Sequence, residues 1–426
     1  MLPNCINIRK YIAIIIILIG VNFLSGQDVF NIDKAVEMAL KHQKLNGQRA
    51  LITDKKDTEI KLLKKQRLPQ IDWTAQATLQ SENIDLEFPV PNIPSISLPL
   101  YKANTDLEAN YMLYDGGITD EMVENKRIMS ELDLSNIDNQ LFQIKSKIVD
   151  LYFSIITLGH QKTILDSSYH ILTIKEKMIS TAIANGVALK SDMDKLKIEE
   201  IKVKNNIAKL ISNRKTLIKV LEDMTGADLK GKEFLSPLKI EYADDWTKRP
   251  EYKSFDLTYK LLDQGKKLII AKRKPKVVLF AKAGIGYPNP FNFFDDNIAA
   301  YGLGGIKFVW NFWDWGKSNL ERQKLEIDKS IVNNKKDVFD EGLKIEKNKI
   351  ESQIQGLEQN LHFNEELIKK QMDLIETLEN QYKNGVATIN DLLVEITKKS
   401  ISEINLAIDK VAIDKLKYKL KTLLGQ

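Results

Sequence analysis

The sequence predicts an α+β membrane protein with two internal structural repeats, each made of two β-strands followed by a long helical hairpin. Three observations lead to this fold class. Two short clusters recur at a constant offset, all eleven prolines fall in two stretches of the chain, and rows of alternating apolar and polar residues precede each long proline-free run. The four strands are expected to form part of a barrel shared between chains.

The first residues of the chain predict a secretory signal. Arg9 and Lys10 precede a long apolar core, and Ser25 and Gly26 supply small residues for cleavage. A membrane anchor is the alternative, because the apolar stretch is only slightly shorter than a membrane span. We expect export with removal of residues 1–26, which carry the single cysteine, so that neither a disulfide nor an acyl anchor is predicted for the mature chain.

The overall charge gives no indication of a nucleic-acid partner. The 63 Lys and Arg residues outnumber the 58 Asp and Glu residues by five, and they are spread along the whole chain. Among four histidines, His160 and His170 are too far apart to present one metal site on a helical face. We find no phosphate loop, nucleophile elbow or zinc motif, and therefore predict no metal, no cofactor and no enzyme activity.

Two clusters recur 199 residues apart. Tyr-Asp-Gly-Gly at 114–117 returns as Trp-Asp-Trp-Gly at 313–316, and Asn-Gly-Val-Ala at 185–188 returns at 384–387. Such self-similarity at one period indicates duplicated supersecondary units.

A third pair of clusters lies upstream of the strands. Arg67-Leu68-Pro69 matches Arg273-Lys274-Pro275 at an offset of 206, so the copies differ by one length change. The sequence therefore predicts a first repeat over 27–236 and a second over 237–426.

The proline-free runs predict long helices. Residues 100–236 and 291–426 contain no proline, and apolar residues from Ile137 to Leu158 recur at alternating steps of four and three, as in a coiled-coil seam. Only the Asn-Gly pairs interrupt these runs with turn chemistry. The predicted helical elements are an N-terminal helix opening at Asn31, a hairpin over 118–224 with its tip near 185–190, a helix over 247–272, and a hairpin over 317–424 with its tip near 384–390.

The alternating rows predict strands with one apolar and one polar face. We expect them near 71–80, 106–114, 277–287 and 303–312. Strands of about ten residues with aromatic ends are typical of transmembrane β-barrels. The aromatic residues expected at the membrane interface, rather than in a core, are Trp73, Tyr111, Tyr287, Phe308, Trp310 and Trp313.

Four strands are too few to close a membrane barrel. Unpaired strand edges are not tolerated in hydrocarbon, and the smallest barrels have about eight strands. Two copies would give eight strands and a lumen filled by side chains, whereas three would give twelve and leave room for a channel. We prefer three copies if the pore carries cargo.

In the order and duplication of these motifs, the chain resembles the TolC-like outer-membrane efflux proteins over essentially its whole mature length. The matching helix–strand junctions are Pro69, Asp115, Gly116, Gly117, Pro275, Asp314 and Gly316. The resemblance implies a homotrimer with a twelve-stranded barrel in the lipid of the bacterial outer membrane and a long α-helical barrel in the periplasm. It also implies a passive exit duct docked to a periplasmic adaptor (membrane fusion) protein and an inner-membrane transporter of the RND or ABC type, in a tripartite efflux pump or type I secretion system.

The resemblance assigns roles to the two hairpin tips. The segments that match adaptor-contacting tips are Asn185, Gly186, Val187, Ala188 and Leu189, and Asn384, Gly385, Val386, Ala387 and Thr388. By position, Asp391 matches an acidic residue of the channel aperture and Asp192 is its counterpart in the first repeat. Tyr382, the third aperture residue, matches a tyrosine in the family's gating hydrogen-bond network. Ala387 and Val394 depart from the family pattern, since the best-known member has an arginine and a second aspartate at these places.

Two alternatives stay open at this stage. Asp391 and Asp192 are either helix N-caps alone or aperture residues with or without a capping role. The chain as a whole is either an outer-membrane duct or an exported coiled-coil scaffold or adhesin with a soluble β-domain, which would bury its apolar rows. An exported enzyme would need a polar constellation that the sequence does not contain.

Overall fold

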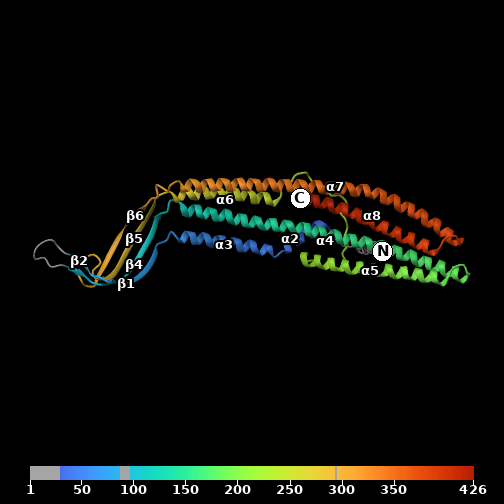
Figure 1. The fold of residues 1–426 in the computed structure, drawn as a ribbon, viewed down its shortest axis with the longest axis horizontal. Coiled ribbons are helices and arrows are strands. Elements are labelled where there is room, and N and C mark those ends of the chain that lie inside the picture. Colours follow the sequence, from blue (N-terminus) through green and yellow to red (C-terminus); the bar gives the residue numbers. More distant parts are fainter. Residues whose placement is uncertain (1–28, 87–95, 293–294) are drawn as a thin grey trace, which may run out of the picture. The chain divides into compact units, whose positions relative to one another are not determined.

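The computed structural model describes residues 29–86, 96–292 and 295–426 and divides into two compact units. The predicted signal at 1–26 lies outside the described residues. One unit comprises Gly47–Ile137 and Glu251–Val338 and contains the main sheet (Figure 1). The other comprises the described residues up to Asn46 together with Asp138–Pro250 and Phe339–Gln426, and it contains both hairpin tips. The two longest helices run from the first unit into the second.

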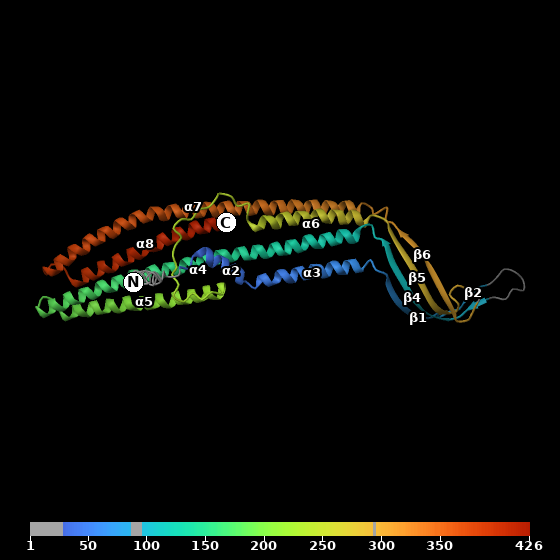
Figure 2. The same ribbon diagram turned by 180° about the vertical axis from the view of Figure 1, so that it is seen from behind.

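Four antiparallel strands form the main sheet in the order β1-β4-β5-β6 (Figures 1 and 2). A second, two-stranded sheet pairs β2 (Ile84–Leu86) with β3 (Ile96–Leu98) within the connection between β1 and β4. The strands of the main sheet are β1 (Gln70–Leu79), β4 (Tyr101–Tyr114), β5 (Lys276–Tyr287) and β6 (Ala299–Val309).

β1 and β5 lie within one residue of their predicted bounds, whereas β4 and β6 differ by more. β4 begins at Tyr101 instead of 106, because its first residues pair with the far end of β1, where Tyr101 lies opposite Leu79. β6 spans 299–309 instead of 303–312, because the ladder with β5 ends at Lys276 opposite Val309. Pro275 precedes Lys276 and has no N–H to donate, so the ladder stops there.

One face of the sheet is apolar and exposed in the single chain. Side chains alternate between the two faces of a strand, and the register places the odd-numbered residues of β1, β4 and β5 on one face with the even-numbered residues of β6. Eight large side chains of this face are 42 to 79% exposed: Ile71, Trp73, Leu79, Leu107, Leu279, Ile285, Ile306 and Phe308. Exposed apolar patches of this kind mark a surface that contacts lipid or a partner.

The two strand hairpins share one register. Trp73 of β1 lies opposite Leu107 of β4, and Leu279 of β5 lies opposite Ile306 of β6. Trp73 and Leu279 are 206 residues apart, and Leu107 and Ile306 are 199 apart. These are the offsets of the recurring sequence clusters.

Two pairs of long helices, α4 with α5 and α7 with α8, are each joined at a tip (Figure 1). None of the helices in the described ranges is apolar over enough residues to span a bilayer. Their bounds are α2 (Ile32–His42), α3 (Leu45–Lys65), α4 (Ile118–Ala184), α5 (Lys190–Thr225), α6 (Pro250–Lys272), α7 (Lys317–Lys383) and α8 (Ile389–Leu423). α6 begins at its proline, which occupies a first-turn position where no N–H is needed.

A buried cluster ties α2, α4, α5 and α8 to the segment that follows α5. Tyr152 and Phe153 of α4 lie at its centre, and both are fully buried. The Tyr152 hydroxyl donates to the backbone oxygens of Phe30 (2.7 Å) and Leu235 (3.0 Å). Burial raises the pKa of Tyr152 to about 12, so the group stays a neutral donor. This one side chain therefore fixes two connecting segments to α4.

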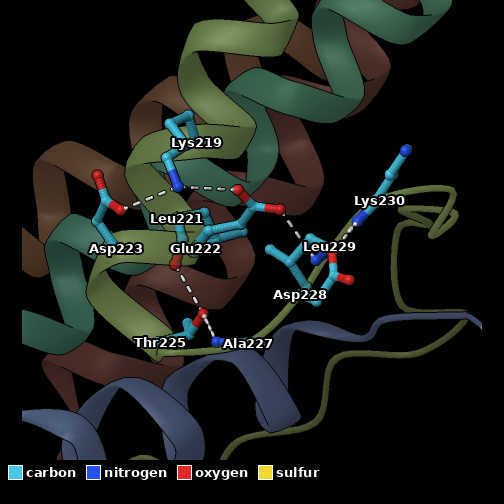
Figure 3. Close-up of polar contacts among 9 residues, drawn as sticks. All are labelled: Lys219, Leu221, Glu222, Asp223, Thr225, Ala227, Asp228, Leu229 and Lys230. Carbon is cyan, nitrogen blue, oxygen red and sulfur yellow. Dashed lines mark hydrogen bonds and ion pairs between the residues drawn. The ribbon is translucent and has the colours of Figure 1, made fainter.

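The end of α5 is held to the following segment by local polar contacts (Figure 3). Glu222 accepts from the backbone N–H of Leu229 (3.1 Å) and pairs with Lys219 (3.5 Å). Thr225 donates to the oxygen of Leu221 (2.7 Å). Gly226 then closes the helix with a φ of 68°, a conformation that favours glycine.

Replacing Tyr152 with Phe should destabilise this unit by about 1–3 kcal/mol, since the change leaves two backbone oxygens without their donor. The measurement is the loss of helical circular dichroism on heating the purified protein. Tyr242→Phe is the matched control, because Tyr242 is exposed in the same unit and its hydroxyl is open to water. Equal melting temperatures for the two variants would contradict this role of Tyr152.

Candidate functional site

Both hairpin tips are built in the same way. Gly186 and Gly385 have φ values of 73° and 71°, which favour glycine. Two backbone hydrogen bonds close each turn. In the first, the N–H of Gly186 donates to the oxygen of Ile183 (2.9 Å) and that of Val187 to the oxygen of Ala182 (2.8 Å). In the second, the N–H of Gly385 donates to the oxygen of Tyr382 (3.0 Å) and that of Val386 to the oxygen of Gln381 (2.9 Å). The Asn-Gly pairs therefore set matching turns at 185–189 and 384–388.

Asp391 caps α8. Its carboxylate accepts from the backbone N–H of Thr388 (3.0 Å) and from the Thr388 hydroxyl (2.7 Å), and the Asp391 N–H donates back to that hydroxyl (3.3 Å). This is a capping box. The hydrogen bonds from Thr388 lower the pKa of Asp391, because they favour its charged form.

Asp192 makes half of the same arrangement at the start of α5. Its carboxylate accepts from the backbone N–H of Leu189 (3.2 Å) and pairs with Lys195 (3.2 Å). The side chain of Leu189 has no acceptor, so no reciprocal bond forms. Neither aspartate is the N-cap itself, because Thr388 and Leu189 hold those positions and the aspartates bond back to them from the first helical turn. The place of both aspartates at a channel aperture stays a prediction.

A tip core joins the four helices that meet at the tips. Its buried residues are Leu165, Leu172, Ile179, Leu196, Val203, Ile389, Leu392, Leu393 and Ile396. Lys175 of α4 pairs with Glu379 of α7 (2.5 Å) and so links the two hairpins. The tip core therefore holds both turns at one end of this unit (Figure 2).

Tyr382 packs half-buried against the tip core. Burial raises its pKa, and the negative charge of Asp192 raises it further. Its hydroxyl is buried and has no hydrogen-bond partner among the described residues. Within residues 29–86, 96–292 and 295–426 of one chain, Tyr382 therefore lacks the hydrogen bond that the resemblance implies.

The tips themselves expose apolar side chains. Val187, Leu189 and Val386 are 65, 70 and 75% exposed, whereas Ala188 and Ala387 are half-buried. Asn185, Asn384 and Thr388 are exposed beside them. Each tip thus presents a small apolar surface with a polar rim, as protein interfaces do.

The junctions between strands and helices share one hydrogen-bond pattern. Asp115 accepts from the backbone N–H groups of Gly117 (2.8 Å) and Thr119 (2.9 Å). Asp314 accepts in the same way from Gly316 (3.1 Å) and Ser318 (3.0 Å). Each aspartate therefore caps the start of a long helix, α4 or α7.

On the other side of these junctions, Pro69 and Pro275 stand directly before β1 and β5. Arg67 lies 3.6 Å from Asp115, and Arg273 lies 3.9 Å from Asp314. The arginine, proline and aspartate of each motif therefore come together where helices meet the sheet.

The predicted interface aromatics are mostly exposed. Trp73, Phe308, Trp310 and Trp313 are 54 to 73% exposed, and Tyr111 is 38% exposed. Trp310 lies one residue beyond β6, not inside it, and donates its indole N–H to the oxygen of Arg273 (3.1 Å).

The sixth predicted aromatic, Tyr287, is half-buried at the end of β5. Its ring stacks on Tyr101 at 5.1 Å between centroids. Contact with a membrane stays a prediction for all six residues.

A buried carboxylate on the polar face of the sheet was not predicted from the sequence. Asp106 of β4 is 2% exposed and accepts from the Thr74 hydroxyl (2.8 Å), while Lys282 of β5 pairs with it at 3.0 Å. Tyr301 of β6 also donates to it (3.1 Å). Gly284 leaves space for the Asp106 side chain, since a Cβ at position 284 would lie 2.6 Å from the Cβ of Asp106. A polar network therefore crosses all four strands.

The chain matches known proteins in structure but not in sequence. No family model matches the sequence, and no curated protein matches it. The outer membrane protein VceC from Vibrio cholerae superposes with a TM-score of 0.65 at 14% identity, covering 92% of this chain and 96% of that one. CusC gives 0.67 at 12% identity, covering 95% and 93%. The CmeC outer membrane channel of Campylobacter jejuni gives 0.61 at 11%, covering 92% and 85%.

Lowering the pH should release the start of α8. Because the folded-state pKa of Asp391 is depressed, the capping contribution is full above the unfolded pKa and is lost as the pH falls through the folded value. Hydrogen exchange of the first α8 turn, expressed relative to intrinsic rates, should show protection falling at acid pH. Asp391→Asn should remove most of that pH dependence, and an unchanged pH profile in the variant would contradict the capping role.

The fold comparison covers nearly all of the described chain and nearly all of these channels. Four strands and two long helical hairpins per chain are what the resemblance implied for a single chain. The chain has the fold of TolC-like outer-membrane channel proteins.

Proposed function

We propose that the protein is the outer-membrane channel subunit of a tripartite efflux pump or a type I secretion system. Three copies would share a twelve-stranded barrel, built from two repeats per chain, and continue into the periplasm as a barrel of helical hairpins. The duct would be passive, with no enzyme activity of its own. The fold similarity to outer membrane channels supports this proposal.

The exposed apolar face of the sheet is the main support for this proposal. A soluble β-domain would bury such a face, as the scaffold or adhesin alternative requires. Here its large side chains, among them Ile71, Leu107 and Ile306, are 54 to 70% exposed. Lipid is the solvent in which this face and the aromatic residues near its ends are stable.

The polar face fits a barrel interior. Charged and amide side chains alternate with the apolar row along β1 and β4. Asp106, Lys282 and Tyr301 are linked across the sheet on this side. In a barrel of twelve strands this face would meet a water-filled lumen.

The tips are the proposed site of adaptor docking and of the aperture. Val187, Leu189 and Val386 offer an exposed apolar surface to a periplasmic adaptor, through which an inner-membrane transporter of the RND or ABC type would deliver cargo. Copies of Asp391 arranged around a narrow axis would favour cations, as acidic rings do in channels. Tyr382 would then find the partner for its hydroxyl on a neighbouring chain.

Conductance of the purified protein in planar bilayers tests the channel and its aperture. Wild-type protein should give small, steady steps that multivalent cations block. Asp391→Ala should weaken this block several-fold, because it removes the acidic ring. Asp223→Ala is the matched control, since this carboxylate is exposed on α5 away from the tip and should leave block unchanged. Unchanged block in Asp391→Ala would remove Asp391 from the aperture, and absence of steps would contradict the channel.

A further inference from the structure

A cavity of about 690 Å³ lies beside the end of α5. One stripe of α5 over 210–222, Lys162 of α4 and residues 228–232 line it, and all of them belong to the compact unit that contains the tips. A cavity of this size can hold a small organic molecule. It takes no part in the channel function proposed above.

The wall formed by residues 228–232 is fixed by the fold. Leu229 is 1% exposed and belongs to the buried cluster around Tyr152. Glu222 accepts from the backbone N–H of Leu229, as Figure 3 shows, and the N–H of Lys232 donates to the Leu229 oxygen (3.2 Å). The segment after α5 is therefore held against the helix, and the cavity is part of the folded chain.

The lining combines apolar walls with an excess of positive charge. The apolar walls come from Leu210, Ile211, Ile218 and Leu229. Six cationic side chains line the cavity against two carboxylates: Lys162, Arg214, Lys215, Lys219, Lys230 and Lys232.

Both carboxylates of the lining already have partners within the chain. Glu222 pairs with Lys219 (3.5 Å), and Asp228 accepts from the backbone N–H of Lys230 (3.0 Å). Among the cations, Lys162 pairs with a carboxylate outside the lining, at 2.5 Å. Positive charge in the cavity therefore remains without a compensating anion.

Arg214 is the clearest case. It is half-buried, with its guanidinium carbon 5.6 Å from the centre of the Phe234 ring, and a Cβ at Gly159 would lie 3.6 Å from its Nε. That Nε is buried and has no hydrogen-bond partner among the described residues, which also supply no ion pair to Arg214 or to Lys215. Burial lowers the pKa of Arg214, because it removes solvation from the charged form. An anion would compensate for this loss.

We propose that this cavity binds an amphipathic organic carboxylate, with its carboxylate on Arg214 and Lys215 and its apolar body against Ile211 and Leu229. The planar guanidinium presents donors in a fork that matches the two oxygens of a carboxylate. A neutral ligand would leave the cations unpaired, and a small inorganic anion would leave the apolar walls in water. The lining therefore favours a ligand with both properties.

Calorimetric titration of octanoate into the full-length protein in lipid nanodiscs tests the proposal, with empty nanodiscs as the blank. Octanoate combines a carboxylate with an apolar chain, and octanamide is its neutral counterpart of the same length. The protein should bind octanoate saturably, and about tenfold or more tightly than octanamide, because only the carboxylate forms charge-assisted hydrogen bonds.

Three variants assign the two parts of the ligand to the lining. Arg214→Gln should weaken octanoate binding about tenfold and leave octanamide binding unchanged. Lys344→Gln is the matched control, because it removes an exposed cation of the same unit away from the cavity and should change neither affinity. Ile211→Ser, at a side chain that is 48% exposed, should weaken both ligands alike by removing apolar contact.

Two results would overturn the proposal directly: equal affinities for octanoate and octanamide, or unchanged octanoate binding in Arg214→Gln. Absence of saturable binding to the wild type would also overturn it, and is the result expected if a neighbouring copy or another protein fills the cavity. If Arg214→Gln fails to fold, Lys215→Gln replaces it, since Lys215 is exposed. This variant should weaken octanoate binding several-fold, and unchanged binding would contradict the assigned site. All of these variants should leave bilayer conductance unchanged, so failure of this proposal is distinguishable from failure of the channel.

Discussion

The outer edges of β1 and β6 carry backbone donors and acceptors that the described strands leave unpaired, and the rest of the structure depends on how these are satisfied. If the exposed apolar face lies in lipid, as we propose, lipid offers no hydrogen bonds to the strand edges. The proposed barrel meets this need, because the four-stranded sheet continues into another copy until the barrel closes. On this proposal, assembly follows from backbone hydrogen bonding before any side chain is considered.

The junctions from strand to helix are built alike in the two halves of the chain. Asp115 and Asp314 cap the long helices while lying near Arg67 and Arg273 at the opposite side of each junction. At each tip the chain reverses direction through a glycine with a positive φ, and an acidic residue follows in the first turn of the next helix. Because these devices are local, they do not depend on the partner chains that the sheet requires.

Much of this could be predicted from the sequence because the signals are local. Proline-free runs and Asn-Gly pairs placed the hairpins within a few residues, and alternation placed the strands. The ends of β4 and β6 could not be predicted, because they depend on strand pairing. β4 begins before 106 because β1 pairs with it as far as Tyr101, and β6 ends before 312 because its partner strand β5 stops at Pro275. The Asp106 network was missed for the same reason, since it needs Gly284 opposite and Lys282 beside it. At the tips, the sequence left capping and aperture roles open for Asp391, and the structure adds the capping box.

We propose that the sheet is complete only when three chains share it. The mass of the mature protein extracted from outer membranes in detergent, measured before and after heating, tests this directly. We expect the mass of three chains in the unheated sample and of one chain after heating. A single chain that stays in solution without detergent would contradict it, because such a chain would have to cover its apolar sheet face and both strand edges by itself.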